Sequence, residues 1–156
     1  MAREILFKAK RECNGEWVEG SPVFYESGEV AIFNEKFTRY GHEATQIWKR
    51  TLVDKDTLCQ YTGLTDKNRR KIFENDVLDS DEVNSLVRFD EENARFVLDD
   101  YGTKGCIMEY GWDENAGGYG FIETNGFDDF MDITEAVEVI GNIFDNPELL
   151  GGADNG

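Results

Sequence analysis

The chain has 156 residues and a net charge of −17, with 40% hydrophobic and 13% aromatic residues. This composition is typical of a globular protein and argues against a disordered chain. No apolar run approaches the roughly 20 residues of a membrane span, and the N-terminus lacks the apolar segment of a secretory signal. Three well-separated cysteines favour neither a disulfide framework nor a thiolate zinc site, which is typical of a reducing compartment.

The first third of the chain predicts a β-meander. The turn signals Asn14-Gly15 and Ser27-Gly28 separate apolar stretches at 4–11, 16–25 and 29–34. A half-buried face is expected from Val18, Val23, Phe24, Tyr25, Val30, Ile32 and Phe33. Pro22 fits an edge or a bulge, because it cannot donate to a ladder. Residues 35–50 show no clean period and are expected to form a loop that ends in a strand around 47–52.

The middle of the chain predicts strands at 57–64 and 71–78, on either side of an Asp66-Lys67-Asn68 turn. Two further strands, 85–89 and 94–98, flank a loop formed by residues 90–93. If Phe89 faces Ala94, then Arg88 faces Arg95, and this like-charge pair requires acidic neighbours.

The last third combines a polar, glycine-rich section at 99–126 with a more legible ending. More hairpins are expected in the section, followed by a short helix at 127–132. An apolar strand follows at 139–144, interrupted by Gly141. Asn146 is a suitable N-cap, Pro147 suits the first helical position, and Gly151 ends the turn.

The negative charge is concentrated in the second half of the chain. Basic and acidic residues number 13 and 12 up to Asn75, but 3 and 21 from Asp76 onward. Such a half repels phosphate backbones and attracts cations or basic proteins. The candidate acidic interaction face consists of Asp79, Asp81, Glu82, Asp90, Glu91, Glu92, Asp99 and Asp100.

A basic hinge precedes this acidic half. Its candidate nucleic-acid contacts are Lys67, Arg69, Arg70 and Lys71. A solvated turn is the favoured interpretation, because four cations beside so acidic a half give little net attraction for phosphate. Aromatic side chains that could stack on bases, although packing is favoured for them, are Trp17, Tyr25, Tyr61 and Trp112.

Catalytic and metal sites are not predicted. Residues 113–123 begin like a calcium loop, but Gly117 occupies a ligand position and Glu123 comes one residue early. His42 is the single histidine, and no activating pattern surrounds it. We therefore expect no enzyme, no catalytic residue, no cofactor and no metal ion.

Three stretches carry a resemblance to a known family: residues 3–20 (REILFKAKRECNGEWVEG), 60–78 (QYTGLTDKNRRKIFENDVL) and 138–150 (EVIGNIFDNPELL). Together they resemble the YopX family of small phage and prophage proteins, while residues 37–50 and 99–126 fall outside these motifs. The resemblance implies a mainly β fold with minor helix, in which a β-rich N-terminal region (1–70) precedes a small SH3-like barrel (71–156). It implies no activity.

The leading hypothesis is a non-enzymatic phage or prophage accessory protein that acts by contact with another protein in the bacterial cytoplasm. One alternative is that the acidic half mimics a nucleic acid and occupies a basic host or phage protein, although acidity that serves only solubility is favoured over this. Another is nucleic-acid binding through residues 67–71. No membrane association is expected. Self-association stays open, because small β domains leave sheet edges to cover.

Overall fold

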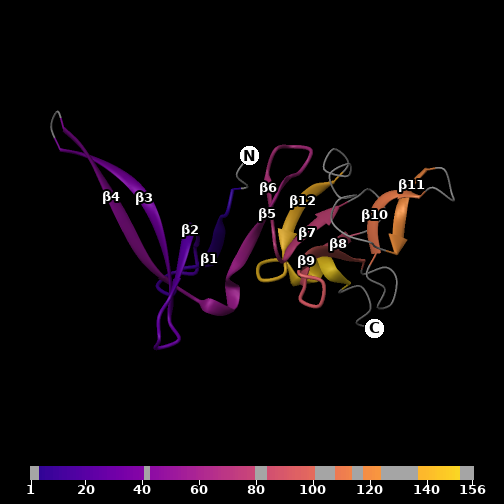
Figure 1. Ribbon diagram of the computed structural model, residues 1–156, viewed down its shortest axis with the longest axis horizontal. Helices are drawn as coiled ribbons and strands as arrows, with labels where there is room; N and C mark the ends of the chain where they lie inside the picture. The colour runs from indigo at the N-terminus through magenta and orange to yellow at the C-terminus, as the bar shows by residue number, and fades with distance from the viewer. Residues whose placement is uncertain are drawn as a thin grey trace. The chain divides into compact units, whose positions relative to one another are not determined.

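The computed structural model describes residues 4–40, 43–79, 84–100, 108–113, 118–123 and 137–151. The chain divides into two compact units, residues 1–61 and 62–156. The sequence predicted this boundary between residues 70 and 71. The observed boundary comes earlier, so the turn at 66–70 belongs to the second unit. Antiparallel strands build both units, and the described helical segments are 3-10 turns of three and four residues. The mainly β prediction is confirmed (Figure 1).

The first unit is a meander closed by a further strand. Its elements are β1 (Phe7–Lys10), β2 (Trp17–Phe24), β3 (Val30–Tyr40), β4 (Glu43–Val53), the turn η1 (Lys55–Thr57) and the start of β5 (Cys59–Thr65). They pair in the order β4-β3-β2-β1-β5. Both predicted turns are present, with Gly15 at φ 72° and Gly28 at φ 90°, a backbone region that favours glycine.

The core of the first unit is small. Its buried members are Ala9, Val18, Val30, Ile32 and Val53. Val23 and Phe24 were expected on the half-buried face, but they are 38% and 67% exposed. The reason is the pairing of β2, which contacts β1 only up to Gly20 and β3 only from Ser21 onward. Pro22 thus sits where β2 has one neighbour, as its missing N–H requires.

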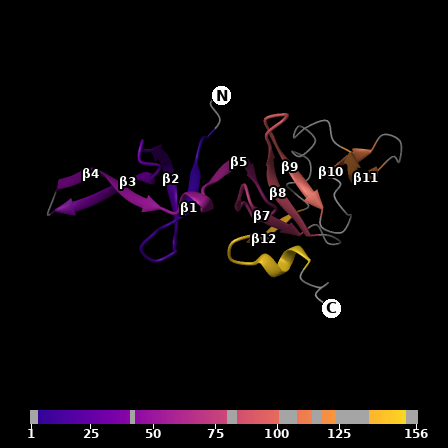
Figure 2. The same ribbon diagram turned by 90° about the horizontal axis from the view of Figure 1, so that it is seen from below.

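Residues 35–40 and 43–50 belong to strands, so the loop expected before residue 47 was wrong, whereas the strand expected around 47–52 is present. β3 and β4 pair without interruption from Val30↔Val53 to Tyr40↔Glu43. Beyond Phe33, β3 pairs with β4 alone, and the two strands continue side by side as a ribbon (Figures 1 and 2). Two strands alone need not bury one face, so no clean alternation marks them, although Thr, Ile and aromatic residues favour strands.

The second unit contains the end of β5 and the remaining strands. These are β6 (Lys71–Phe73), β7 (Asp76–Asp79), β8 (Asn84–Asp90), β9 (Arg95–Asp100), β10 (Met108–Asp113), β11 (Gly118–Glu123) and β12 (Glu138–Asn142), followed by the turn η3 (Pro147–Leu150). β6 is the neighbour of β5 in the sheet, and β10 pairs with β11. The other four strands form a sheet in the order β12-β7-β8-β9. In the described ranges this sheet does not close into a barrel, which corrects that detail of the implied fold.

The loop of the β8–β9 hairpin lies one residue further along the chain than predicted, so each residue of β8 pairs two positions further along β9 than expected. Phe89 pairs with Phe96, and Asp90 pairs with Arg95. The loop is therefore formed by residues 91–94, and the expected contact between Arg88 and Arg95 does not occur. The observed register places a carboxylate opposite Arg95 and sets the rings of Phe89 and Phe96 5.2 Å apart in an edge-to-face arrangement.

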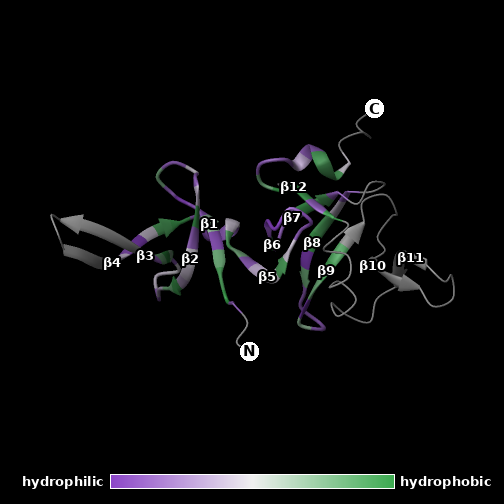
Figure 3. Ribbon diagram, turned by 90° about the horizontal axis from the view of Figure 1, so that it is seen from above, coloured by the Kyte–Doolittle hydropathy of each residue, from purple (hydrophilic) through white to green (hydrophobic). Residues whose placement is uncertain are grey.

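The core of the second unit includes the apolar residues of the stretch 71–78, which the sequence predicted to be extended. Ile72, Phe73, Val77 and Leu78 are all buried. The core cluster consists of Ile72, Leu78, Val87, Phe96, Leu98, Val137 and Val139. Figure 3 shows hydrophobic stretches along β9 and β12, whereas the β8–β9 turn is hydrophilic.

The chain leaves the sheet through a tightly packed corner. β12 shifts register between Val139 and Gly141. A Cβ at Gly141 would meet the side chain of Asn146, with Leu149 Cδ1 at 2.9 Å. Asn146 precedes η3 as predicted, but its side chain makes no cap bond; its Oδ1 accepts from the backbone N–H of Asn142 at 3.4 Å. Gly151 ends the turn at φ 105°.

Candidate functional site

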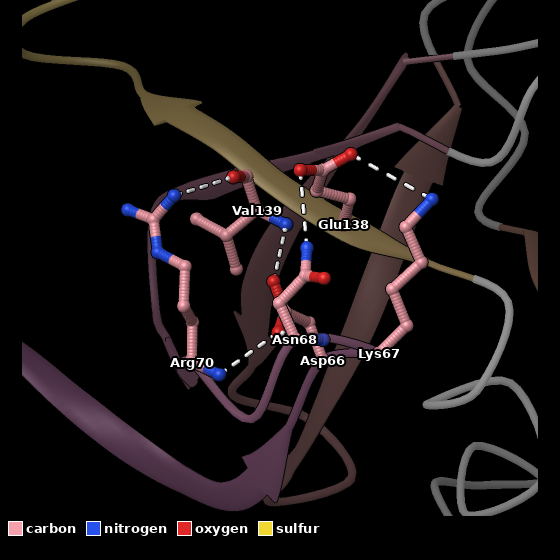
Figure 4. A network of polar contacts seen from close by, with 6 residues as sticks. All are labelled: Asp66, Lys67, Asn68, Arg70, Glu138 and Val139. Carbon is pink, nitrogen blue, oxygen red and sulfur yellow. Dashed lines mark hydrogen bonds and ion pairs between the residues drawn. The ribbon is translucent and has the colours of Figure 1, made fainter.

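The turn between β5 and β6 is organised by one buried carboxylate. Asp66 is 4% exposed. Its Oδ1 accepts from the backbone N–H groups of Asn68 and Arg70, both at 2.8 Å, and its Oδ2 accepts from the N–H of Val139 at 2.9 Å. Figure 4 shows this arrangement, in which Asp66 joins its own turn to β12. An aspartate that accepts from nearby backbone N–H groups is a common turn device, but the bond to Val139 spans 73 residues.

The pKa of Asp66 reflects this environment. Burial on its own raises the pKa, but the backbone N–H of Val139, those of Arg70 and Asn68, and the charge of Arg70 together lower it below the ordinary value of 3.8. These groups bind the ionised form more strongly than the protonated form. Asp66 is therefore a charged structural group near neutral pH.

The hinge cations lie around the same contact. The Arg70 guanidinium donates through Nη1 to the carbonyl oxygen of Val139 at 3.0 Å. Lys67 Nζ lies 3.6 Å from Glu138 Oε2, and Asn68 donates to Glu138 Oε1 at 3.1 Å (Figure 4). Two of the four candidate nucleic-acid contacts thus bind β12 of their own chain, which favours the structural interpretation of the hinge.

The other two candidate cations, Arg69 and Lys71, have different positions in the turn and in β6. Arg69 is exposed and has φ 64°, a conformation that completes the turn. Lys71 begins β6 and is half-buried. A similar device follows at Asp76, whose Oδ2 accepts from the backbone N–H of Phe73 at 2.8 Å. Asp76 therefore caps the turn between β6 and β7.

The acidic candidates do not share one environment. Asp90 is 9% exposed, and its carboxylate accepts from the Glu92 N–H at 3.1 Å and from Asn93 Nδ2 at 2.8 Å, with Arg95 Nε at 3.5 Å. The Asn93 side chain, the backbone N–H groups and Arg95 lower the pKa of Asp90, against the raising effect of burial. Asp90 therefore stabilises the hairpin.

The remaining acidic candidates lie on three elements. Glu91 and Glu92 are exposed in the β8–β9 turn, and Asp79 is half-buried at the end of β7. Asp99 and Asp100 end β9. Asp81 and Glu82 lie outside the described residues. Of the candidate face, Glu91 and Glu92 are thus the carboxylates that the structure describes as open to solvent.

The candidate stacking aromatics are held by their own chain where the structure describes them. Lys8 and Lys10 place their ammonium groups 4.8 Å and 5.5 Å from the Trp17 ring centre. Tyr25 accepts from Arg50 Nε at 2.7 Å, with the guanidinium 5.0 Å from its ring centre. Tyr61 is 7% exposed, which is the packing role predicted for it.

Three sequence features lie wholly or partly outside the described residues. His42 and the proposed helix at 127–132 fall outside them. So do residues 114–117 of the calcium-like loop, which separates β10 from β11. The position of the Trp112 side chain is likewise not described. Within the described residues, no group of three His, Cys, Asp or Glu side chains could hold a metal ion, and no helix is long and apolar enough to cross a membrane.

Sequence reasoning did not predict that several large apolar side chains of the first unit are exposed. The large hydrophobic residues recorded as exposed are Ile5, Val23, Phe24, Ile47 and Trp48. Ile47 and Trp48 are consecutive in β4, so they point to opposite faces of the ribbon. β4 is also an edge strand in the described sheet, because its order begins β4-β3. Adjacent apolar residues in a strand that contains two threonines and a tryptophan were the available signal.

One of the comparisons with known proteins identifies a family. No curated protein matches the chain. The crystal structure of protein EF1440 from Enterococcus faecalis is similar at 22% identity and a TM-score of 0.48, covering 96% of this chain and 99% of that one. The model of the family described as YopX protein matches residues 6–151. Since this match spans nearly the whole chain, the protein belongs to the YopX family.

Proposed function

We propose that this protein is a non-enzymatic phage or prophage accessory protein that works in the bacterial cytoplasm by binding another protein. The observation that carries the proposal is the edge strand β4. It has 11 residues, and its exposed Ile47 and Trp48 lie in the ribbon beyond the core. Long apolar edge strands are natural sites for pairing with a further chain.

The partner contact is strand addition along β4. A two-stranded ribbon is marginally stable in water, so a third strand would stabilise it. In such complexes the main chain supplies affinity and alternate side chains supply specificity. Trp48 at 64% exposure and Ile47 at 44% would each meet the partner on a different face of the ribbon. Exposed aromatic residues of this kind commonly dominate binding energy.

Two carboxylates of the second unit, Asp66 and Asp90, are poorly suited to acid–base catalysis. Asp66 and Asp90 both have a pKa below the ordinary value, and both accept hydrogen bonds that hold turns. An acid–base catalyst needs a pKa moved toward the working pH, which for a carboxyl group means upward.

The experiment places a photo-crosslinking amino acid at position 48 in phage-infected bacteria, with the same group at the exposed Ser27 as the matched control. A partner should crosslink at 48 and not at 27. The purified partner should then bind the Trp48→Lys variant at least about tenfold more weakly than the wild type, and the Ser27→Lys variant equally well. Equal affinity for all three proteins would contradict the proposal. Sedimentation of the purified chain alone shows whether the partner is a second copy.

A second function is favoured by charge. Residues 62–156 contain 7 basic and 23 acidic residues, against 9 and 10 in residues 1–61. We therefore keep nucleic-acid mimicry by the second unit as the alternative. It predicts a basic partner whose binding weakens steeply with salt and is reduced by Glu91→Gln and Glu92→Gln. Binding that is insensitive to both salt and these changes would exclude it.

A further inference from the structure

The first unit contains a cavity of about 610 Å³ where β1 ends beside β4. Its polar lining comes from Arg11, Glu12, Cys13, Lys49, Arg50 and Thr51. Small-molecule sites in proteins span about 300–1,000 Å³, so the volume suits a small ligand. The cavity is therefore large enough to be a binding site.

Strand register explains why these side chains meet. Arg11 forms an isolated bridge with Val53, and the N–H of Glu12 donates to the carbonyl oxygen of Leu52 at 3.2 Å. These contacts hold the end of β1 against the end of β4. Thr51 pairs with Ile32, and Lys49 is two residues away on the same face of β4. Arg11 thus lies beside a face that carries a hydroxyl and an ammonium group.

Two residues of the cavity lining each carry one buried polar atom that lacks a partner. Arg11 Nε and Thr51 Oγ1 are both buried, and neither has a hydrogen-bond partner within the described ranges. A buried polar atom left without a partner costs about 1–3 kcal/mol, so native structures seldom keep one unless water, an ion or a ligand satisfies it. Both atoms can donate, which suits an acceptor-rich ligand.

The charge of the lining gives the sign of that ligand. Arg11, Lys49 and Arg50 are basic, and Glu12 is the acidic member. Arg50 is already oriented by Tyr25, to which its Nε donates. A guanidinium presents a planar fork that matches phosphate oxygens, and a neighbouring lysine adds a point charge. The lining is therefore cationic in a chain whose net charge is −17.

The neighbouring cavity differs in this respect. It has the same volume of about 610 Å³ and shares Arg11, but four carboxylates, Glu12, Glu29, Asp54 and Asp56, line it together with Lys10 and Lys55. An anion would meet net negative charge there. Lys55 therefore supplies a control cation that lies near the proposed site without lining it.

The geometry points to a binding site for the phosphate group of a small phosphomonoester, held by Arg11, Lys49 and Thr51. The Arg11 fork and the Thr51 hydroxyl donate to phosphate oxygens, and Lys49 balances the charge. The volume beyond the phosphate leaves room for the group esterified to it. This site is separate from the strand-pairing edge proposed above, because it uses the inner face of β4 and the end of β1.

The test is a titration of the full ¹⁵N-labelled chain with inorganic phosphate, adenosine monophosphate and acetate at constant ionic strength, followed by amide shifts. Both phosphates should give saturable shifts at residues 11–13 and 49–52. Tighter binding of the nucleotide identifies an esterified ligand, and equal binding identifies phosphate alone. Acetate should bind on the order of tenfold more weakly, since it lacks the third oxygen.

Variants test the residues. Arg11→Gln and Lys49→Gln should each weaken phosphate binding on the order of tenfold, and Thr51→Val a few-fold, whereas Lys55→Gln should leave it unchanged. Unshifted signals of the buried residues Val18 and Cys59, which do not pair with any of the changed positions, show that each variant is folded. The inference is overturned if millimolar phosphate gives no saturable shifts, if acetate binds equally well, or if folded Arg11→Gln and Lys49→Gln both bind like the wild type.

Discussion

Several charged and apolar side chains differ between the two units in whether they contact their own chain. In the second unit, Asp66 and Asp90 each bind several groups of their own chain, and the cation Arg70 donates to a backbone carbonyl. In the first unit, Arg11 Nε has no described partner, and Trp48 is 64% exposed. These groups of the second unit thus serve its fold, whereas Arg11 and Trp48 are the groups of the first unit through which we propose that it binds other molecules.

The comparison teaches that net charge alone does not show which groups of this protein are available for recognition. The acidic half drew attention because it carries the net charge, yet Asp90 stabilises a hairpin. The nearly neutral half exposes the groups that suit recognition. An exposed apolar residue and a buried polar atom without a partner are more informative than a surplus of carboxylates, since the latter also serves solubility.

The largest effect is expected from a cavity in the core of the second unit. Leu78 is fully buried, so Leu78→Ala should lower the free energy of unfolding by about 2–5 kcal/mol. Trp48→Ala removes a larger side chain from the first unit but should change stability by no more than about 0.5 kcal/mol. Urea unfolding of both variants measures the difference. Equal losses would show that the exposed residue packs as a core residue does.

The next effect tests the carboxylate that joins the β5–β6 turn to β12. Asp66→Ala leaves three backbone N–H groups without their acceptor and should destabilise the protein by about 3 kcal/mol. Glu91→Ala, which removes an exposed carboxylate of the same unit, should stay within about 0.5 kcal/mol. The same unfolding experiment compares the two. A small loss for Asp66→Ala would mean that water replaces the carboxylate.

A smaller effect is expected at the bend of β2. A Cβ at Gly20 would collide with the carbonyl oxygen of Phe33 and lie 2.7 Å from Ile32 Cγ2. Because a backbone atom cannot move aside cheaply, Gly20→Ala should cost about 1–3 kcal/mol. Ser21→Ala, at an exposed position in the same strand, is the control and should be nearly neutral. Hydrogen exchange would show whether the loss is concentrated in β2 and β3.

The smallest effect concerns acid. Because the pKa of Asp66 is lowered on folding, its ionised form stabilises the protein fully above the ordinary value of 3.8, and this contribution is lost as pH falls through the folded-state pKa. The stability difference between the wild type and Asp66→Ala should therefore be constant from pH 7 to 5 and should shrink below pH 3.8. A difference that grows on acidification would contradict the assigned charge state.

Much of the fold could be predicted because local signals agree with it. The glycine turns, the buried 72–78 stretch and the Asn-Pro start of the last turn are all determined by neighbours in sequence. The ribbon at 34–49 was missed because its strands pair only with each other, so no buried face imposes a period. The β8–β9 register was off by two residues because the pairing of Asp90 with Arg95 outweighed a simple loop count.

The candidate sites were less predictable, since they depend on contacts between distant residues. The acceptor role of Asp66 toward its own turn follows from the sequence, but its bond to Val139 does not. Likewise, Arg11 and Thr51 are 40 positions apart, and the bridge at Val53 and the hydrogen bond between Glu12 and Leu52 bring their segments together. Periodicity and turn rules describe neighbours and contain no information on such pairs.

The last strand has a consequence for biosynthesis. β12 pairs with β7, and its Val139 contributes both to the core and to the contact with Asp66. Until this strand has left the ribosome, the apolar residues of β6 to β9 lack the pairing of β12 with β7 and the core contacts of Val139. The second unit should therefore complete its folding only after β12 has left the exit tunnel, when residues 1–61 are already outside it. A premature stop before residue 137 would leave an apolar nascent sheet as a substrate for chaperones and proteases.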